Sequence, residues 1–186
     1  MNTKILFTLL VFLLFFFISC SDDNEPMPGK NGNCTVTVVA GGAEYKYSCV
    51  YDTKTEGSLE IMTLTTEDVK DNADYGIFTG AKITYMYKLQ GTGIYEVVSA
   101  KRLDDGKEND KRQISMYVEL GDKSKTYSTY QSWSGTDHKV GITENEGKYY
   151  ILVSEPVKLS YSGGIGAGTS SPDVPQVIEI KMQMHL

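Results

Sequence analysis

The chain is poor in the residues that most often carry enzyme chemistry. Its 186 residues include two histidines, three cysteines and one tryptophan. The histidines, His138 and His185, form no H-x-x-x-H pair, and no C-x-x-C pair, G-x-S-x-G elbow or phosphate-binding loop is present. The sequence therefore predicts no catalytic residue, no metal site and no cofactor. An enzyme would have to rest on the adjacent Asp137 and His138, and we expect a non-catalytic protein.

Positive charge is also in short supply. Lysine and arginine total 18 against 24 aspartates and glutamates, which gives a formal net charge of −6. No basic stripe stands out along the chain, so nucleic acid is not a predicted partner. The length suits a signal segment followed by one domain with a real core.

Only one long apolar run occurs, and it is too short to span a bilayer. The run "ILFTLLVFLLFFFI" covers residues 5–18 and follows Lys4. A spanning helix needs about 20 residues, whereas the hydrophobic region of a signal peptide is shorter. We expect residues 1–19 to be a cleaved signal peptide.

The residues that end this run resemble the lipobox of bacterial lipoproteins. The match is "FISC", in which Ile18, Ser19 and Cys20 fit the pattern and Phe17 replaces the commoner leucine. The following "SDDNE" resembles the acidic export signal of surface lipoproteins of the Bacteroidetes. The resemblance implies that Cys20 carries lipid and anchors the protein to the outer membrane, facing outward. The alternative is an ordinary signal peptide followed by a polar start.

A polar linker separates this anchor from the rest. Residues 21–33 read "SDDNEPMPGKNGN" and have too little apolar surface to pack. We expect residues 20–33 to be the lipidated cysteine with a flexible tether, and residues 34–186 to be a single domain.

Apolar and polar residues alternate with a period of two through most of that domain. The clearest runs are "AKITYMYKL" (81–89), "QISMYVEL" (113–120) and "VIEIKMQMHL" (177–186), and similar runs lie near 44–51, 57–65, 94–99, 138–143 and 148–160. Each run is typical of a strand with one face in the core. The pattern predicts an all-β fold, an antiparallel β-sandwich of about 8–10 short strands, with a lipocalin-like β-barrel as the alternative.

One predicted hairpin places two cysteines opposite each other. If Gly41-Gly42 is a two-residue loop, Val38 faces Tyr45 and Cys34 faces Cys49. A slip by one residue would misplace both faces of the hairpin. We therefore expect a Cys34–Cys49 disulfide, which suits an exported protein. The alternative is a pair of buried, reduced thiols.

Aromatic residues are the main candidates for ligand binding. Tyr127, Tyr130 and Trp133 lie among polar residues in "TYSTYQSWSGTDH", where flat rings can stack on sugar faces. The alternative is that Trp133 caps the core. The glycine-rich segment 163–175 is expected to be a surface loop and a possible lid. The acidic clusters at 67–74 and 104–110 fit solvated loops better than calcium sites.

The layout of the whole chain looks like that of small Bacteroidetes lipoproteins with a β-rich domain of unknown function. The similarity lies in the strand order and the turn "GTGIYEV" (91–97). Such families supply no catalytic residue. Our own expectation is a lipid-anchored, non-catalytic binding or accessory module for a glycan or another envelope component. The alternative is a structural or assembly protein of the cell surface, in which the final strand completes its own sheet or, as the less favoured option, pairs with the edge of a neighbour.

Overall fold

The fold is built almost entirely from β-strands. The computed structural model describes residues 30–66, 80–104, 110–122, 126–165 and 174–184. The strands are β1 Lys30–Ala40, β2 Ala43–Glu56, β3 Leu59–Thr66, β4 Ala81–Tyr87, β5 Gly93–Val97, β6 Gln113–Asp122, β7 Thr126–Gln131, β8 Lys139–Asn145, β9 Lys148–Ile165 and β10 Val177–Met184, and the helix is α2 Ala100–Asp104. The expected all-β class is thereby confirmed.

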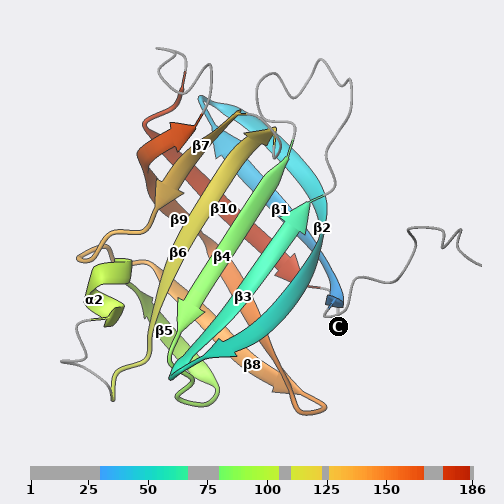
Figure 1. Ribbon diagram of the computed structural model, residues 1–186, viewed down its shortest axis with the longest axis vertical. Coiled ribbons are helices and arrows are strands. Elements are labelled where there is room, and N and C mark those ends of the chain that lie inside the picture. The colour runs from blue at the N-terminus through green and yellow to red at the C-terminus, as the bar shows by residue number, and fades with distance from the viewer. Residues whose placement is uncertain (1–29, 67–79, 105–109, 123–125, 166–173, 185–186) are drawn as a thin grey trace, which may run out of the picture. The chain divides into compact units, whose positions relative to one another are not determined.

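All ten of these strands belong to one hydrogen-bonded sheet. Its order is β10-β1-β2-β3-β4-β6-β5-β8-β9-β7, with further pairings of β10 with β9 and of β6 with β7. Strands β3, β4 and β6 cross in front of β9 and β10 in Figure 1, so opposite parts of the sheet face each other across the core. The two layers expected of a sandwich are therefore parts of one continuous sheet.

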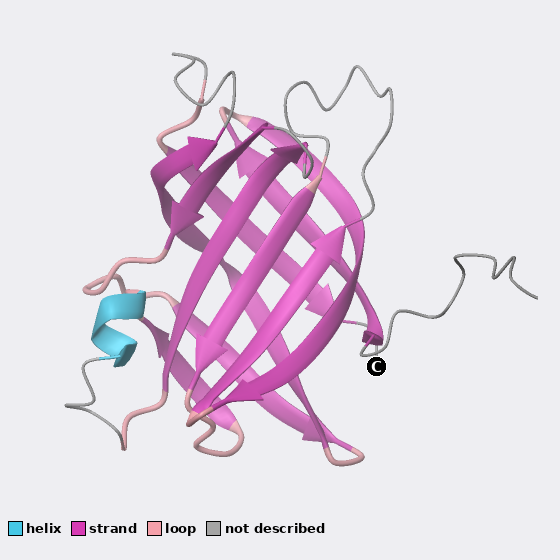
Figure 2. Cartoon of the chain, viewed as in Figure 1, coloured by secondary structure: helices cyan, strands magenta, loops and turns pink. Residues whose placement is uncertain are grey.

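The strand pairings close the sheet on itself. Strand β9 pairs with both β7 and β10, and β10 pairs in turn with β1. The closure is not that of a regular barrel (Figure 2). Strand β5 pairs in parallel with β6 and in antiparallel fashion with β8. Strand β6 is therefore connected to β9 both through β7 and through β5 and β8. Closure leaves few unpaired strand edges.

The alternating pattern places the core residues where the sequence predicts them. On β4, Ala81, Ile83, Tyr85 and Tyr87 are buried. The apolar residues of the predicted inner faces of β6 and β10 are likewise buried, namely Ile114, Met116, Val118, Leu120, Ile178, Ile180, Met182 and Met184. Side chains on successive strand residues point to opposite faces, so each strand contributes every second residue to the core.

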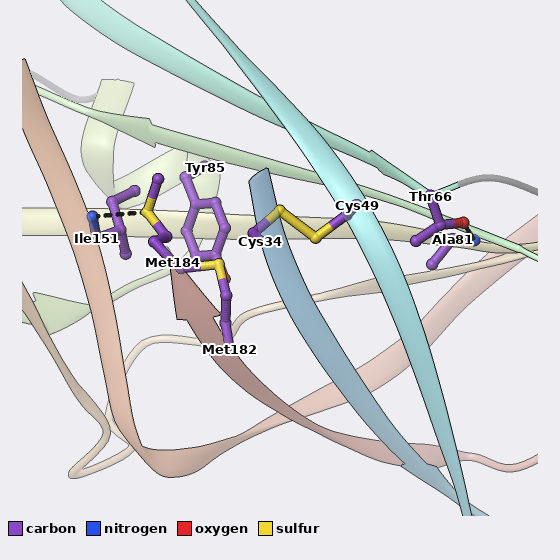
Figure 3. Close-up of a disulfide and its surroundings, with 8 residues drawn as sticks. All are labelled: Cys34, Cys49, Thr66, Ala81, Tyr85, Ile151, Met182 and Met184. Atoms are coloured by element: carbon purple, nitrogen blue, oxygen red, sulfur yellow. Dashed lines mark hydrogen bonds between the residues drawn. A yellow bond between two sulfur atoms is a disulfide. The ribbon is translucent and has the colours of Figure 1, made fainter. Parts of the chain in front are cut away.

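The first hairpin carries the predicted disulfide. Strands β1 and β2 are neighbours joined through Gly41 and Gly42, whose φ angles are 59° and 84°. Such angles favour glycine and suit a two-residue hairpin turn. Cys34 and Cys49 are bonded, with an S–S distance of 2.12 Å. Figure 3 shows the bond between β1 and β2, on the same side as Tyr85.

Two methionines of the last strand take part in sulfur contacts inside the sheet. The Tyr85 hydroxyl donates to Met182 Sδ at 3.5 Å, and the Ile151 backbone N–H donates to Met184 Sδ at 3.2 Å (Figure 3). Strand β10 pairs with β9 only as far as the Met182–Val153 pair. A flexible thioether therefore provides an acceptor for Ile151 where strand pairing has ended.

The second hairpin has a tight turn at Glu146 and Gly147. Asn145 pairs with Lys148 and Ile142 pairs with Ile151. Glu146 has a φ of 51° and Gly147 a φ of 77°. In this register, Val140, Ile142, Ile151 and Val153 share the core-facing side, and all four are buried.

Three features differ from the sequence prediction. Strand β1 begins at Lys30, four residues before the expected start of the domain at Cys34. Strand β7 occupies part of the polar segment expected to be a strand end or a loop, because its pairings with β6 and β9 compensate for a polar sequence. Helix α2 has only five residues, too few to show a helical period in the sequence.

Candidate functional site

A pocket lined by tyrosines lies at one end of the sheet. Its volume is about 170 Å³, and its walls are Tyr51, Thr53, Glu60, Tyr87, Gly147, Lys148 and Tyr149. Figure 1 shows this end, where the β2–β3 turn, the end of β4 and the β8–β9 hairpin are found. Tyr51 and Tyr87 are buried and form the floor, whereas Thr53, Gly147 and Lys148 are exposed and form the mouth.

The strand registers bring these residues together. Tyr51 and Thr53 lie two residues apart on β2, so they share a face. Glu60 of β3 pairs directly with Tyr87 of β4. Tyr149 follows the tight β8–β9 turn and pairs with Glu144. A hairpin turn, a strand end and a second hairpin tip therefore supply the walls.

Further tyrosines hold the floor in place. The rings of Tyr51 and Tyr150 lie edge to face with centroids 6.4 Å apart, and those of Tyr87 and Tyr95 do so at 6.0 Å. The Tyr95 hydroxyl accepts from the backbone N–H of Gln90 and donates to the Gly91 carbonyl, both at 2.8 Å. Edge-to-face pairs add about 0.5–1.5 kcal/mol beyond their buried area, so the floor is packed before any ligand arrives.

The phenol groups of the floor are neutral at physiological pH. Burial raises the pKa of Tyr87, and the nearby charge of Glu60 raises it further. Burial likewise raises the pKa of Tyr51, with a smaller contribution from Tyr150. Within the described part of the chain, the Tyr87 hydroxyl forms no hydrogen bond, although the residue is only 2% exposed. The hydroxyl is not among the fully enclosed polar atoms that lack a partner, so it keeps contact with solvent and a ligand in the pocket can accept from it.

Glu60 is the one carboxylate in the pocket wall, and its orientation is fixed. The Thr55 hydroxyl lies 3.0 and 3.2 Å from its two oxygens. Lys148 is the one ammonium in the wall, and it is exposed next to the turn. The pocket thus combines aromatic rings, hydroxyl groups, a held carboxylate and a solvated ammonium.

The aromatic residues singled out from the sequence do not form one surface. Tyr130 is fully buried in the core, with its ring edge to face with Tyr161 at 5.8 Å. Tyr127 is half-buried on β7, and Trp133 is 50% exposed. Of the three, Trp133 presents the most exposed ring to solvent.

Hydrogen bonds hold the turn that carries Trp133. The Ser134 hydroxyl accepts from the backbone N–H of Ser99 at 3.1 Å and lies 3.0 Å from the Ser99 hydroxyl. The Thr136 hydroxyl donates to the Trp133 carbonyl at 3.3 Å. These contacts tie the turn to the start of α2 and keep the indole at the surface.

Other expected features fall partly or wholly outside the described residues. Cys20, the acidic segment 67–74 and most of the loop 163–175 lie there. In the ranges that the structure does describe, no group of three or more acidic, histidine or cysteine side chains is placed to hold a metal ion. His138 Nε2 accepts from the Lys158 backbone N–H at 3.3 Å, a contact that holds β9 close to β8.

Sequence reasoning missed the pocket because its tyrosines follow the core pattern. Tyr87 continues the inner face of β4, and Tyr51 continues that of β2. The available signal was Tyr149, which lies close to the tight turn at Glu146 and Gly147 and is only half-buried. Only the meeting of three chain segments shows that these rings surround a hollow.

Searches against protein-family models, curated proteins and solved structures find no match for this chain. Among the described residues, no helix has the length and apolar character needed to cross a membrane.

Proposed function

We propose that the protein is a lipid-anchored, non-catalytic binding module of the cell envelope, and that it holds a glycan in the tyrosine pocket. The observation that carries this proposal is the wall itself, in which Tyr51, Tyr87 and Tyr149 surround a hollow together with hydroxyl and charged groups. Apolar walls with a few placed polar groups are the usual composition of a ligand site.

The chemistry of the wall suits a sugar. The half-buried Tyr149 ring offers a flat apolar face to the C–H groups of a pyranose, while hydroxyl groups of the wall reach its polar edge. The Tyr87 hydroxyl and the Glu60 carboxylate supply a donor and an acceptor for sugar hydroxyls. The pocket volume is about 170 Å³, so we expect it to hold one sugar unit rather than a long chain.

The anchoring part of the proposal rests on the sequence around Cys20. Lipidation there would hold the domain within a few tens of ångströms of the outer membrane through the tether that ends near Lys30. Growth with an alkyne-labelled fatty acid should label the protein, and Cys20→Ala should remove the label. Protease treatment of whole cells should cut the chain if the domain faces outward.

Binding is tested with the full-length chain in a non-ionic detergent. Calorimetric titration with a panel of oligosaccharides should give saturable heat with one glycan class. Tyr149→Ala should weaken that binding about tenfold or more, because a stacked aromatic contact is lost. Tyr45→Ala is the matched control, since Tyr45 is also half-buried against the core but lies outside the pocket. No heat with any glycan, or equal losses in both variants, would contradict the proposal.

A second candidate function, assembly at the cell surface, is favoured by an apolar row on the outer face of the sheet. Ile94 pairs with Gly141, and Gly141 pairs with Leu152. Ile94 is 61% exposed and Leu152 is 44% exposed, with no side chain on Gly141 between them. Sedimentation of the full-length chain would show concentration-dependent dimers if this row joins two copies, and Ile94→Ser would abolish them.

A further inference from the structure

We propose that the tyrosine pocket selects a ligand with a positively charged nitrogen, namely an amino sugar, and that Glu60 determines this specificity. The inference rests on the proposed function and names the class of glycan. Two observations carry it: a fixed carboxylate without an ion-pair partner, and the neutral aromatic rings around it.

Glu60 is placed to receive a cation. It is half-buried, pairs with Tyr87 across β3 and β4, and lines the pocket. Its oxygens are held by the Thr55 hydroxyl, which is a neutral donor. Among the described residues, no lysine or arginine forms an ion pair with Glu60. Its negative charge is therefore available to a ligand that enters the pocket.

The aromatic walls favour the same sign of charge. The faces of tyrosine rings carry negative potential and attract ammonium groups, more strongly where water is excluded. Tyr51 and Tyr87 are 2% exposed, so little of the surface of these two side chains is in contact with water. Aromatic rings combined with one carboxylate give a cation two kinds of attraction, whereas an anionic ligand would be repelled by both.

Lys148 opposes this preference only weakly. Its side chain is exposed beside the turn, where water and salt screen its charge. Glu60 is half-buried, so its charge is screened less than that of the exposed Lys148. We therefore expect Lys148 to reduce the affinity for a cation without setting the specificity. The two residues give variants with opposite expected effects.

The test compares two sugars that differ in charge. Oligomers of glucosamine and of N-acetylglucosamine, matched in length, are titrated into the full-length chain in detergent. The glucosamine oligomer should bind about tenfold more tightly, the effect expected of a hydrogen bond to a charged group. Glu60→Gln should remove that difference, and Lys148→Met should increase the affinity for the glucosamine oligomer. Choline is a third probe, because a lipid headgroup is another source of an ammonium.

The outcomes separate the charge preference from glycan binding. One outcome is equal binding of both oligomers, with binding lost in Tyr149→Ala and kept in Glu60→Gln. That result would overturn the role of Glu60 and leave the proposed function intact. Binding of choline alone would overturn the assignment to an amino sugar. Binding of none of the three, or binding that Tyr149→Ala does not change, would overturn both proposals.

Discussion

Cys34 and Cys49 are joined across the first hairpin, with their Cα atoms 4.9 Å apart and a sequence separation of 15. The bond closes the loop that contains the Gly41-Gly42 turn. In the chain-entropy model, a loop of this length contributes about 3 kcal/mol to the free energy of unfolding. The double variant Cys34→Ser/Cys49→Ser should lose stability of that order in urea titrations. Reductant should destabilise the natural chain and leave the double variant unchanged; equal stability of the two proteins would contradict the account.

Two leucines of β9 test which face of the strand lies in the core. Leu159 is fully buried, whereas Leu152 is 44% exposed. Leu159→Ala should cost about 2–5 kcal/mol, because it removes buried apolar surface and leaves a cavity. Leu152→Ala is the matched control and should stay within about 0.5 kcal/mol of the natural chain. Similar losses from both substitutions would show that the register of β9 is different.

Glu146 is the only non-glycine residue with a positive φ among those described, at 51°. An L-residue with a side chain pays about 1–2 kcal/mol for this conformation, and glycine does not. Glu146→Gly should therefore increase the midpoint of thermal unfolding. Glu144→Gly, two residues earlier in β8, should lower the midpoint because glycine weakens a strand. A decrease in both variants would argue against the tight turn.

Alkaline pH should destabilise the fold through its buried tyrosines. Burial raises the pKa of Tyr85 and Tyr87 above the ordinary value and raises the pKa of Tyr130 to about 12. Between about pH 10 and pH 12 the unfolded chain therefore holds fewer protons than the folded one, and the free energy of unfolding falls as pH rises. Urea titrations at neutral pH and within this window should show a decreasing midpoint. A constant midpoint would mean that these phenols are accessible to water.

The strand pattern of the fold could be predicted from the sequence because each strand has one buried face. The alternation in "AKITYMYKL" places Ile83 and Tyr85 in the core, and the pairing across Gly41-Gly42 places Cys34 beside Cys49. Such signals are local: they need one strand or one hairpin. The closure of the sheet depends on pairings between distant segments, such as β1 with β10, which no local pattern encodes.

The candidate site depends even more on distant segments. Tyr130 stands in a polar segment that resembles a binding loop, but its pairing with Val118 of β6 and Tyr161 of β9 carries it into the core. Tyr51 and Tyr87 show the pattern of core residues, and they become pocket walls because the sheet ends beside them. The same residue type in the same pattern therefore serves packing in one place and lines a hollow in another.

The most direct test of the central claim is an amide ¹H–¹⁵N correlation spectrum of the full-length chain in detergent, recorded during titration with a glucosamine oligomer. Binding in the tyrosine pocket predicts saturable shifts that gather at Thr53, Glu60 and the 147–149 segment, while amides of the Trp133 turn stay in place. Shifts centred on Trp133, or no shifts at the highest ligand concentration of the titration, would contradict the assignment of the pocket as the binding site.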